Sequence, residues 1–167
     1  MIPHKKRVAG FFRLLTLLFL GSCVGYGESP VARSVGFETI ERGQQSGVRT
    51  SKAAVILDET AWSRFWMEHK KTAPSDATPP AVDFSKEMVI AIFLGGRPTG
   101  GFSVSVAEIS IPESAGGLSV NYEEIKPGRR CIVPMVITYP YQIVRLARNE
   151  GTVVFNHAIR VKDCSSR

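Results

Sequence analysis

The apolar positions of this chain follow a helical period in one segment. Five residues recur at i, i+1, i+4, i+5 and i+8, which places them on one face of an amphipathic helix. They are Ala61, Trp62, Phe65, Trp66 and His69. Asp58 can cap the start of this helix, and Glu59 interacts favourably with the helix dipole in the first turn. At this spacing Trp62 and Trp66 are predicted to be core residues rather than a ligand-stacking face, and His69 a helix-terminal residue rather than a metal ligand.

Most other apolar residues follow the period of β-strands. Residues 88–94 (MVIAIFL) are continuously apolar, which predicts a central strand buried on both faces. Residues 102–106 alternate, and the phase then slips, which predicts a bulge near Ala107-Glu108. Further strands are predicted at residues 37–40, 53–57, 118–122, 132–138, 141–146, 152–155 and 158–161. The fold class is therefore α+β, an antiparallel β-sheet that can curl into a barrel or sandwich, with one amphipathic helix packed on it.

The N-terminal residues differ from the predicted domain. Lys5, Lys6 and Arg7 precede a short apolar run, LLTLLFL, and the sequence Leu20-Gly21-Ser22-Cys23 resembles the lipobox of bacterial lipoproteins. The alternative is that Cys23 is an unmodified cysteine near the end of an ordinary signal peptide. We predict a lipoprotein signal peptide at residues 1–22, lipidation of Cys23, a flexible tether at 23–35 and a single domain at 36–164. The protein is then exported and lipid-anchored in the bacterial cell envelope.

Removal of this signal peptide changes the charge balance. The whole chain has 21 basic and 15 acidic residues, and its calculated pI is about 9.5. Four basic residues precede Cys23, so the mature chain has 17 basic and 15 acidic residues, a net charge of +2. The high pI therefore describes mainly the export signal. We predict no nucleic-acid partner, because no basic helix or aromatic-interleaved basic strand is present.

Two cysteines remain in the predicted domain, Cys131 and Cys164. Export places them where disulfides persist, and an even number of cysteines favours pairing. Two alternatives stay open, a pair of buried free thiols and a reactive Cys131 thiolate activated by Arg129 and Arg130. We predict the disulfide.

The stretch GGRPTGG at residues 95–101 is the most unusual motif. It is not a phosphate loop, because a strand rather than a helix follows it and the GK[ST] ending is missing. It fits a hairpin turn with Pro98 after Arg97. Pro98 and the glycines suffice for the turn, whereas the side chains of Arg97 and Thr99 have no evident structural role. A plain hairpin and a contact loop are both compatible with this motif, and we predict that Arg97, Pro98 and Thr99 contact a partner.

The stretch Tyr139-Pro140-Tyr141 interrupts a strand-like run. Proline there implies a sheet edge, a bend or a cis bond. The two tyrosines are candidate partner-binding residues, and the alternative is that they pack at a sheet corner with their hydroxyl groups hydrogen-bonded.

Catalytic chemistry has little support in the sequence. There is no G-x-S-x-G motif, and the histidines His69 and His157 lack metal-ligand spacing. Asp83 and the pair Glu123-Glu124 follow no pattern that would make them converge. We predict no catalytic residues, no metal and no cofactor.

Several motifs in a fixed order resemble the C-terminal domain of the PrcB protease-complex subunit family. The matching residues are Trp62, Asp83-Phe84, residues 95–104, Val120, Tyr122, Pro127-Gly128, Cys131 and residues 139–146. The resemblance covers residues 37–155 and implies a non-catalytic lipoprotein that associates with a surface protease complex and stabilises it.

Three hypotheses follow. The first is a protein-binding accessory module whose partner is another envelope protein, with a protease as the candidate that the resemblance suggests. The second is a protease inhibitor that presents the GGRPTGG and TYPY loops. The third is an envelope enzyme without a recognisable motif.

Overall fold

A computed structural model describes residues 32–71, 78–113 and 116–164. The predicted signal peptide, Cys23 and most of the predicted tether lie outside these residues. None of the helices in the described part is long and apolar enough to cross a membrane.

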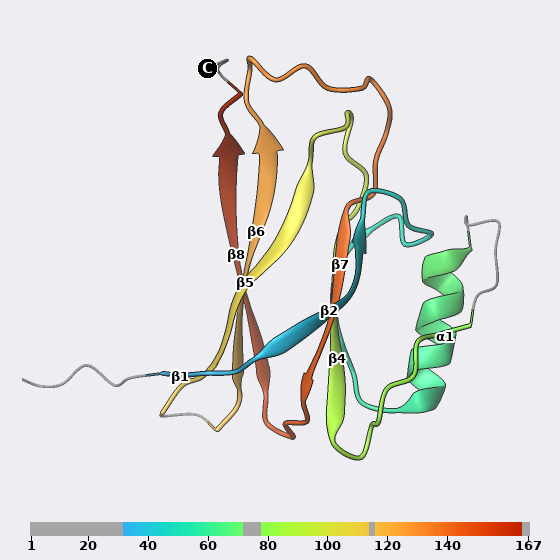
Figure 1. Cartoon of the computed structure of the whole chain (residues 1–167), viewed down its shortest axis with the longest axis vertical. Helices are drawn as coiled ribbons and strands as arrows, with labels where there is room; N and C mark the ends of the chain where they lie inside the picture. The colour runs from blue at the N-terminus through green and yellow to red at the C-terminus, as the bar shows by residue number, and fades with distance from the viewer. Residues whose placement is uncertain (1–31, 72–77, 114–115, 165–167) are drawn as a thin grey trace, which may run out of the picture.

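In the described part of the chain, eight strands form two four-stranded sheets, and one helix lies beside them (Figure 1). The first sheet has the order β1-β5-β6-β8 and the second the order β2-β7-β4-β3. The strands are β1 Arg33–Ser34, β2 Phe37–Gly43, β3 Ser51–Ile56, β4 Glu87–Leu94, β5 Ser103–Ile111, β6 Leu118–Pro127, β7 Tyr141–Ala147 and β8 Val153–Lys162, and the helix is α1 Glu59–Lys70. All pairings are antiparallel except that of β6 with β8, which is parallel. The α+β prediction is confirmed, as an open sandwich.

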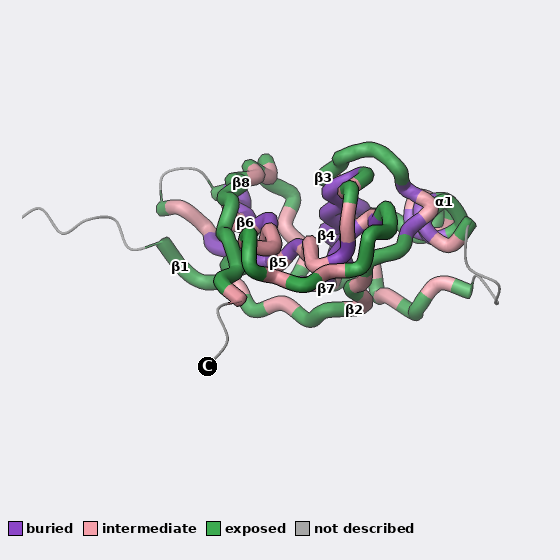
Figure 2. The backbone as a smooth tube through the Cα atoms, turned by 90° about the horizontal axis from the view of Figure 1, so that it is seen from above, coloured by how far each residue is buried: buried purple, intermediate pink, exposed green. Residues whose placement is uncertain are grey.

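The second sheet is the middle layer of three (Figures 1 and 2). Its β4 residues Ile90 and Ile92 face the first sheet and pack in one core cluster, whereas Val89 and Phe93 face α1 in another. All four side chains are at most 1 % exposed. The predicted central strand buried on both faces is confirmed, because a strand covered by a sheet and a helix needs apolar residues at every position.

Helix α1 begins where the sequence predicts. The carboxylate of Asp58 accepts a hydrogen bond from the backbone N–H of Ala61 at 2.7 Å, so it caps the first turn. Trp62 and Trp66 are 0 % and 4 % exposed and pack on the middle sheet, which confirms that they are core residues. The indole N–H of Trp62 donates to the carbonyl of Pro80 at 2.9 Å, so its polar atom is satisfied as well.

The structure agrees with some details of the predicted elements and differs in others. The bulge in β5 is confirmed by a register shift between Val106 and Glu108. The predicted strand at 132–138 is wrong, because this segment is a loop in which only Thr138 makes a β-bridge. The two predicted C-terminal strands are one continuous strand, β8. Part of the predicted tether pairs with β5 as β1, so the domain begins before Gly36.

The connection between β4 and β5 is not a hairpin. β4 lies in the second sheet and β5 in the first, so the GGRPTGG stretch carries the chain from one sheet to the other. Two glycines make this crossing possible. Gly95 and Gly101 have φ values of 73° and 82°, and a Cβ atom at Gly95 would lie 2.7 Å from the backbone nitrogen of Ser51. The hairpin prediction is therefore wrong, because hydrophobic periodicity does not show which strands pair.

Candidate functional site

Two loops meet at one end of the sandwich (Figure 1). One is the β4–β5 connection at residues 95–102, and the other is the β6–β7 connection at residues 128–140. We call these two segments together the loop end. It contains most of the sequence-predicted partner-binding residues, together with Cys131.

Backbone hydrogen bonds join the two loops. Arg97 and Thr138 exchange a pair of N–H···O bonds of 2.8 and 2.9 Å, and the N–H of Gly100 donates to the carbonyl of Pro134 at 2.8 Å. The Thr138 hydroxyl adds a bond of 3.0 Å to the carbonyl of Thr99. The longer loop is thus attached to the shorter one at two separate points.

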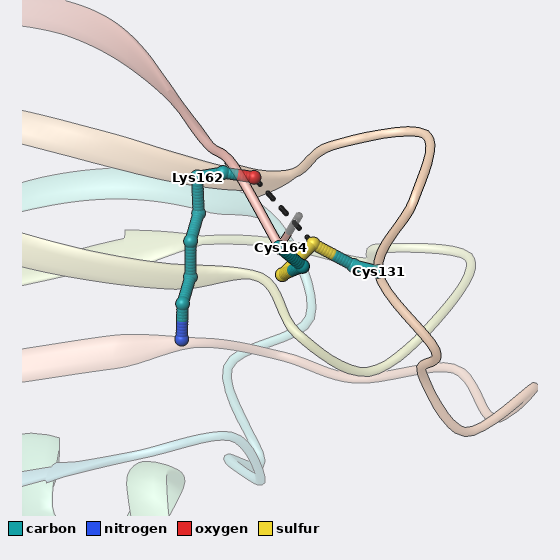
Figure 3. Close-up of a disulfide and its surroundings, with 3 residues drawn as sticks. All are labelled: Cys131, Lys162 and Cys164. Atoms are coloured by element: carbon teal, nitrogen blue, oxygen red, sulfur yellow. Dashed lines mark hydrogen bonds between the residues drawn. A yellow bond between two sulfur atoms is a disulfide. The ribbon is translucent and has the colours of Figure 1, made fainter. Parts of the chain in front are cut away.

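A disulfide fixes the start of the longer loop (Figure 3). Cys131 and Cys164 are joined, with their Cα atoms 4.9 Å apart, so the loop is tied to the chain beyond the end of β8. The Cys131 sulfur lies 3.5 Å from the carbonyl oxygen of Lys162. Because a disulfide sulfur carries no proton, this is a close approach rather than a donated bond. The pairing excludes the reactive Cys131 thiolate for as long as the disulfide is intact.

Between these attachment points the loop exposes large apolar side chains to solvent. They are Ile132 at 103 %, Met135 at 87 %, Val136 at 50 % and Ile137 at 58 %. We call these four residues the apolar tip. Single exposed apolar residues are common on protein surfaces, but four within six positions of one loop form a patch of the kind found at interaction sites.

Arg97 has a structural role that the sequence did not reveal. Its guanidinium makes two hydrogen bonds to the carboxylate of Glu124 on β6, of 3.0 and 2.8 Å, and donates to the carbonyl of Leu94 at 2.7 Å. The side chains of Arg97 and Glu124 are only 22 % and 5 % exposed. The expectation that Arg97 has no structural role is therefore wrong, because a strand of the first sheet places a carboxylate beneath the crossing loop.

Glu124 is held in its charged form. The hydrogen bonds from Arg97 lower the pKa of Glu124 below its usual range, against the opposing effect of burial. Two further side chains lie near the carboxylate, the amine of Lys126 at 3.9 Å and the imidazole of His157 at 3.8 Å. The neighbouring Glu123 pairs instead with Arg160 at 2.8 Å. The two adjacent glutamates thus have separate partners, and they do not form a carboxylate pair.

The two tyrosines of the TYPY stretch have different environments. Tyr141 is 6 % exposed, and its hydroxyl donates to Glu41 at 2.9 Å, so it is not available to a partner. Burial and the hydrogen bond to Glu41 raise the pKa of this hydroxyl. Tyr139 is only half-buried, and the guanidinium of Arg49 lies 4.0 Å from its ring centre. The prediction of Tyr141 as a contact residue is therefore wrong, whereas Tyr139, Pro98 and Thr99 keep surface exposed to solvent. No cis peptide bond occurs in the described residues, including at Pro140.

A second polar cluster lies at the C-terminal end of α1 and includes Tyr141, which directly follows the loop end in the chain. His69 is 2 % exposed, with its Nδ1 atom 2.9 Å from the Ser46 hydroxyl and its Nε2 atom 3.2 Å from Glu41. Burial lowers the pKa of His69, more than Glu41 raises it. Burial also opposes the charge of Glu41, but hydrogen bonds from Lys70, Tyr141 and His69 lower its pKa overall.

The order serine–histidine–glutamate in this cluster is that of a hydrolase triad, but its geometry is that of a closed structural network. Ser46 is 1 % exposed, and its oxygen already accepts the N–H of Val48 at 3.0 Å. A nucleophile must reach a substrate carbonyl, and this oxygen has no path to one. A neutral His69 that accepts from Ser46 and donates to Glu41 satisfies every partner. Sequence reasoning missed this cluster because Glu41, Ser46 and His69 share no motif.

Other ionisable groups named from the sequence stay apart. Asp83 lies on the surface and binds its own neighbours, with Ser85 donating to it at 2.5 Å and Lys86 at 3.0 Å. Within the described residues, no group of three or more histidine, cysteine, aspartate or glutamate side chains could hold a metal ion.

The fold is a β-rich frame that carries an exposed apolar loop, and the disulfide and backbone hydrogen bonds hold that loop in place. Residues 88–147 match the family model described as PrcB C-terminal, which confirms the resemblance found in the sequence motifs over this part of the chain. The matched residues run from β4 to β7 and include both loops of the loop end. No curated protein and no solved structure matches the chain.

Proposed function

We propose that this protein is a non-catalytic accessory lipoprotein that binds another protein of the cell envelope through its loop end. The observation that carries the proposal is the apolar tip. Its four side chains are at least half exposed, although the loop that bears them is attached by a disulfide and by backbone bonds to the neighbouring loop. A partner that covers this tip gains apolar burial with little loss of loop entropy.

The surroundings of the apolar tip favour a protein as the partner. Tyr139 and Pro98 lie in the joined loops, and Arg129 and Arg130 begin the longer one as exposed cations. Apolar residues surrounded by arginine and tyrosine are the composition that protein–protein interfaces prefer. The match to the PrcB C-terminal model supports an accessory role, and the resemblance of the sequence motifs suggests a protease complex as its setting.

Site-specific photo-crosslinking tests this proposal in intact cells. A photoreactive amino acid at Met135 should give one discrete protein adduct, identifiable by mass spectrometry. The matched control is Met67, which is 59 % exposed but belongs to α1 and to neither loop of the loop end. Equal adduct patterns at both positions, or lipid adducts alone at Met135, would refute a protein partner at the loop end.

A protease inhibitor is the second candidate, favoured by the position of both loops at one end of the domain. If the crosslinked partner is a protease, its activity with and without the purified protein distinguishes the two functions. An accessory subunit preserves or raises protease activity and lifetime, whereas an inhibitor lowers activity in proportion to occupancy.

Anchoring at Cys23 is proposed from the sequence alone. A fatty-acid probe should label the full chain and should not label the variant Cys23→Ser. Equal labelling of both chains would rule out this anchor, and would leave the binding role of the loop end to be judged by the crosslinking experiment.

A further inference from the structure

Strand β8 forms an open edge of the first sheet (Figure 1). Its ten residues pair with β6 in one uninterrupted parallel register, from Leu118↔Val153 to Pro127↔Lys162. The strand contains neither glycine nor proline. Among the described strands none pairs with its other side, so a row of backbone N–H and C=O groups faces outward.

The edge strand β2 of the other sheet is different. It has a register shift between Thr39 and Glu41, and it carries the charged Glu38, which pairs with Arg145. Bulges and charges are the features that keep an edge from pairing with another chain. β8 has no bulge, and it exposes three large apolar side chains. They are Val154 at 54 %, Ile159 at 56 % and Val161 at 63 %.

We propose that a second copy of this chain pairs with β8, antiparallel and centred on His157, so that the two first sheets become one eight-stranded sheet. In this register residue i of one copy lies opposite residue 314 − i of the other. Residues of odd number face the core side of the sheet, where Val153 and Phe155 already pack. Phe155 then meets Ile159 of the other copy, and Val153 meets Val161, so apolar side chains lie opposite apolar side chains on that face.

The charges of β8 agree with an antiparallel arrangement. Arg160 lies opposite Val154 of the second copy, and the two Arg160 side chains are about 20 Å apart along the strands. That separation exceeds the screening length of about 8 Å at physiological salt. Each Arg160 is also paired with Glu123 at 2.8 Å. A parallel arrangement in register would instead bring the two Arg160 side chains side by side. The sequence of β8 is therefore self-complementary in one orientation.

This inference does not depend on the proposed function, because β8 and the apolar tip are different surfaces. A strand-to-strand contact is small compared with a standard interface of about 1,600 Å². We therefore expect a reversible dimer with a dissociation constant in the micromolar range.

Analytical ultracentrifugation of the chain without its signal peptide, over a range of concentrations, measures this dimer. The variant Ile159→Lys places a charge opposite Phe155 and should weaken dimerisation at least about tenfold, a change of about 1.4 kcal/mol. The control Met67→Lys changes an equally exposed apolar residue on α1 and should dimerise like the wild type. A wild type that stays monomeric at several hundred micromolar would overturn the proposal, and so would a dimer that Ile159→Lys leaves intact.

Cysteine crosslinking tests the register directly. In the proposed dimer the two residues at position 157 lie opposite each other, so His157→Cys should form an intermolecular disulfide under mild oxidation. Val154→Cys is the control, because two residues at position 154 lie about 20 Å apart. Equal crosslinking of both variants, or crosslinking of Val154→Cys alone, would refute this register. Circular dichroism of each variant shows whether the fold is retained.

Discussion

Two groups of large apolar side chains in this molecule have opposite environments. On α1, Trp62, Phe65 and Trp66 are at most 6 % exposed and pack against β4. In the β6–β7 loop, Ile132 and Met135 are 103 % and 87 % exposed. The two groups are chemically similar, but one is covered by a sheet of the same chain and the other is covered by no described residue.

The difference shows that different interactions hold the two groups in place. Burial of the helix face removes apolar surface from water and stabilises the fold. The exposed loop is not stabilised by apolar burial, so covalent and polar attachments hold it in place. The disulfide, the Arg97–Thr138 bridge and the pairing of Arg97 with Glu124 supply them. In the proposed function, stability and recognition then depend on different residues, and substitutions can separate them.

The largest effect is expected on the helix side. Trp62→Ala removes a fully buried indole and its hydrogen bond to Pro80, and leaves a cavity between α1 and the middle sheet. We expect a loss of about 3–5 kcal/mol in the free energy of unfolding, measured by urea denaturation. The control Met67→Ala, on the exposed side of the same helix, should cost less than about 0.5 kcal/mol. Similar losses for both variants would contradict the conclusion that the buried face of α1 stabilises the fold.

Removal of the disulfide should have the next largest effect. The paired substitutions Cys131→Ser and Cys164→Ser open a loop with a sequence separation of 33 residues. The chain-entropy estimate is a loss of about 3–4 kcal/mol in the free energy of unfolding. Hydrogen exchange should rise at residues 128–138 more than in β4. Unchanged exchange there would mean that the polar attachments alone hold the loop.

Arg97→Ala should also destabilise the fold, in contrast to what the sequence suggested. It leaves the buried Glu124 carboxylate without its bidentate partner, and only Lys126 and His157 remain near it, at 3.9 and 3.8 Å. We expect a loss of about 2–3 kcal/mol in the free energy of unfolding. Arg129→Ala, which changes an exposed arginine of the neighbouring loop, should be nearly neutral. Equal melting temperatures for both variants would show that the Arg97–Glu124 pair contributes little to the stability of the fold.

The same pair predicts a dependence on pH. The hydrogen bonds from Arg97 lower the pKa of Glu124 in the folded state relative to the unfolded state. The resulting stabilisation is therefore complete above the unfolded carboxyl pKa of about 4.3, and is lost as the pH falls through the folded value. The difference in stability between wild type and Arg97→Ala should shrink below about pH 4. A stability difference that is constant from pH 7 to pH 3 would show that the charged form of Glu124 is not the source of the stabilisation.

The smallest effect on stability is expected at the apolar tip. Met135→Lys exchanges a side chain that is already 87 % exposed, so the free energy of unfolding should change by less than about 0.5 kcal/mol. Binding of the partner found by crosslinking should nevertheless weaken at least about tenfold, because a central apolar contact is replaced by a charge. A Met135→Lys variant that binds normally would leave the tip without a role in recognition.

Some features were readable from single segments of the sequence. The cap at Asp58, the core position of Trp62 and Trp66, and the two-sided burial of β4 each follow from local spacing and side-chain type. The bulge in β5 was visible as a slip of the alternating pattern. These features were predictable because helix and strand periods appear within a few residues.

The predictions that the structure corrects failed for a common reason, which is that they depend on residues distant in sequence. The segment 132–138 is apolar enough for a strand, but Pro134 and the disulfide-tied Cys131 hold it as a loop. Pro134 was the available sign of this, since proline is rare inside strands. Tyr141 and Arg97 were both expected at a contact surface, but Glu41 and Glu124 bind them in the interior. These two glutamates lie 100 and 27 residues away in sequence, and no local pattern links them.

The sequence by itself thus determined the helix, most of the strands, the two-sided character of the central strand and the resemblance that the family model confirms at residues 88–147. Only the tertiary structure decided which strands pair, that the GGRPTGG stretch crosses between sheets, and which polar side chains are buried in pairs. It also decided which apolar residues stay in solvent. The physical reason is that side-chain periodicity is a property of a few neighbouring residues, whereas pairing and burial depend on which distant segment arrives to cover them.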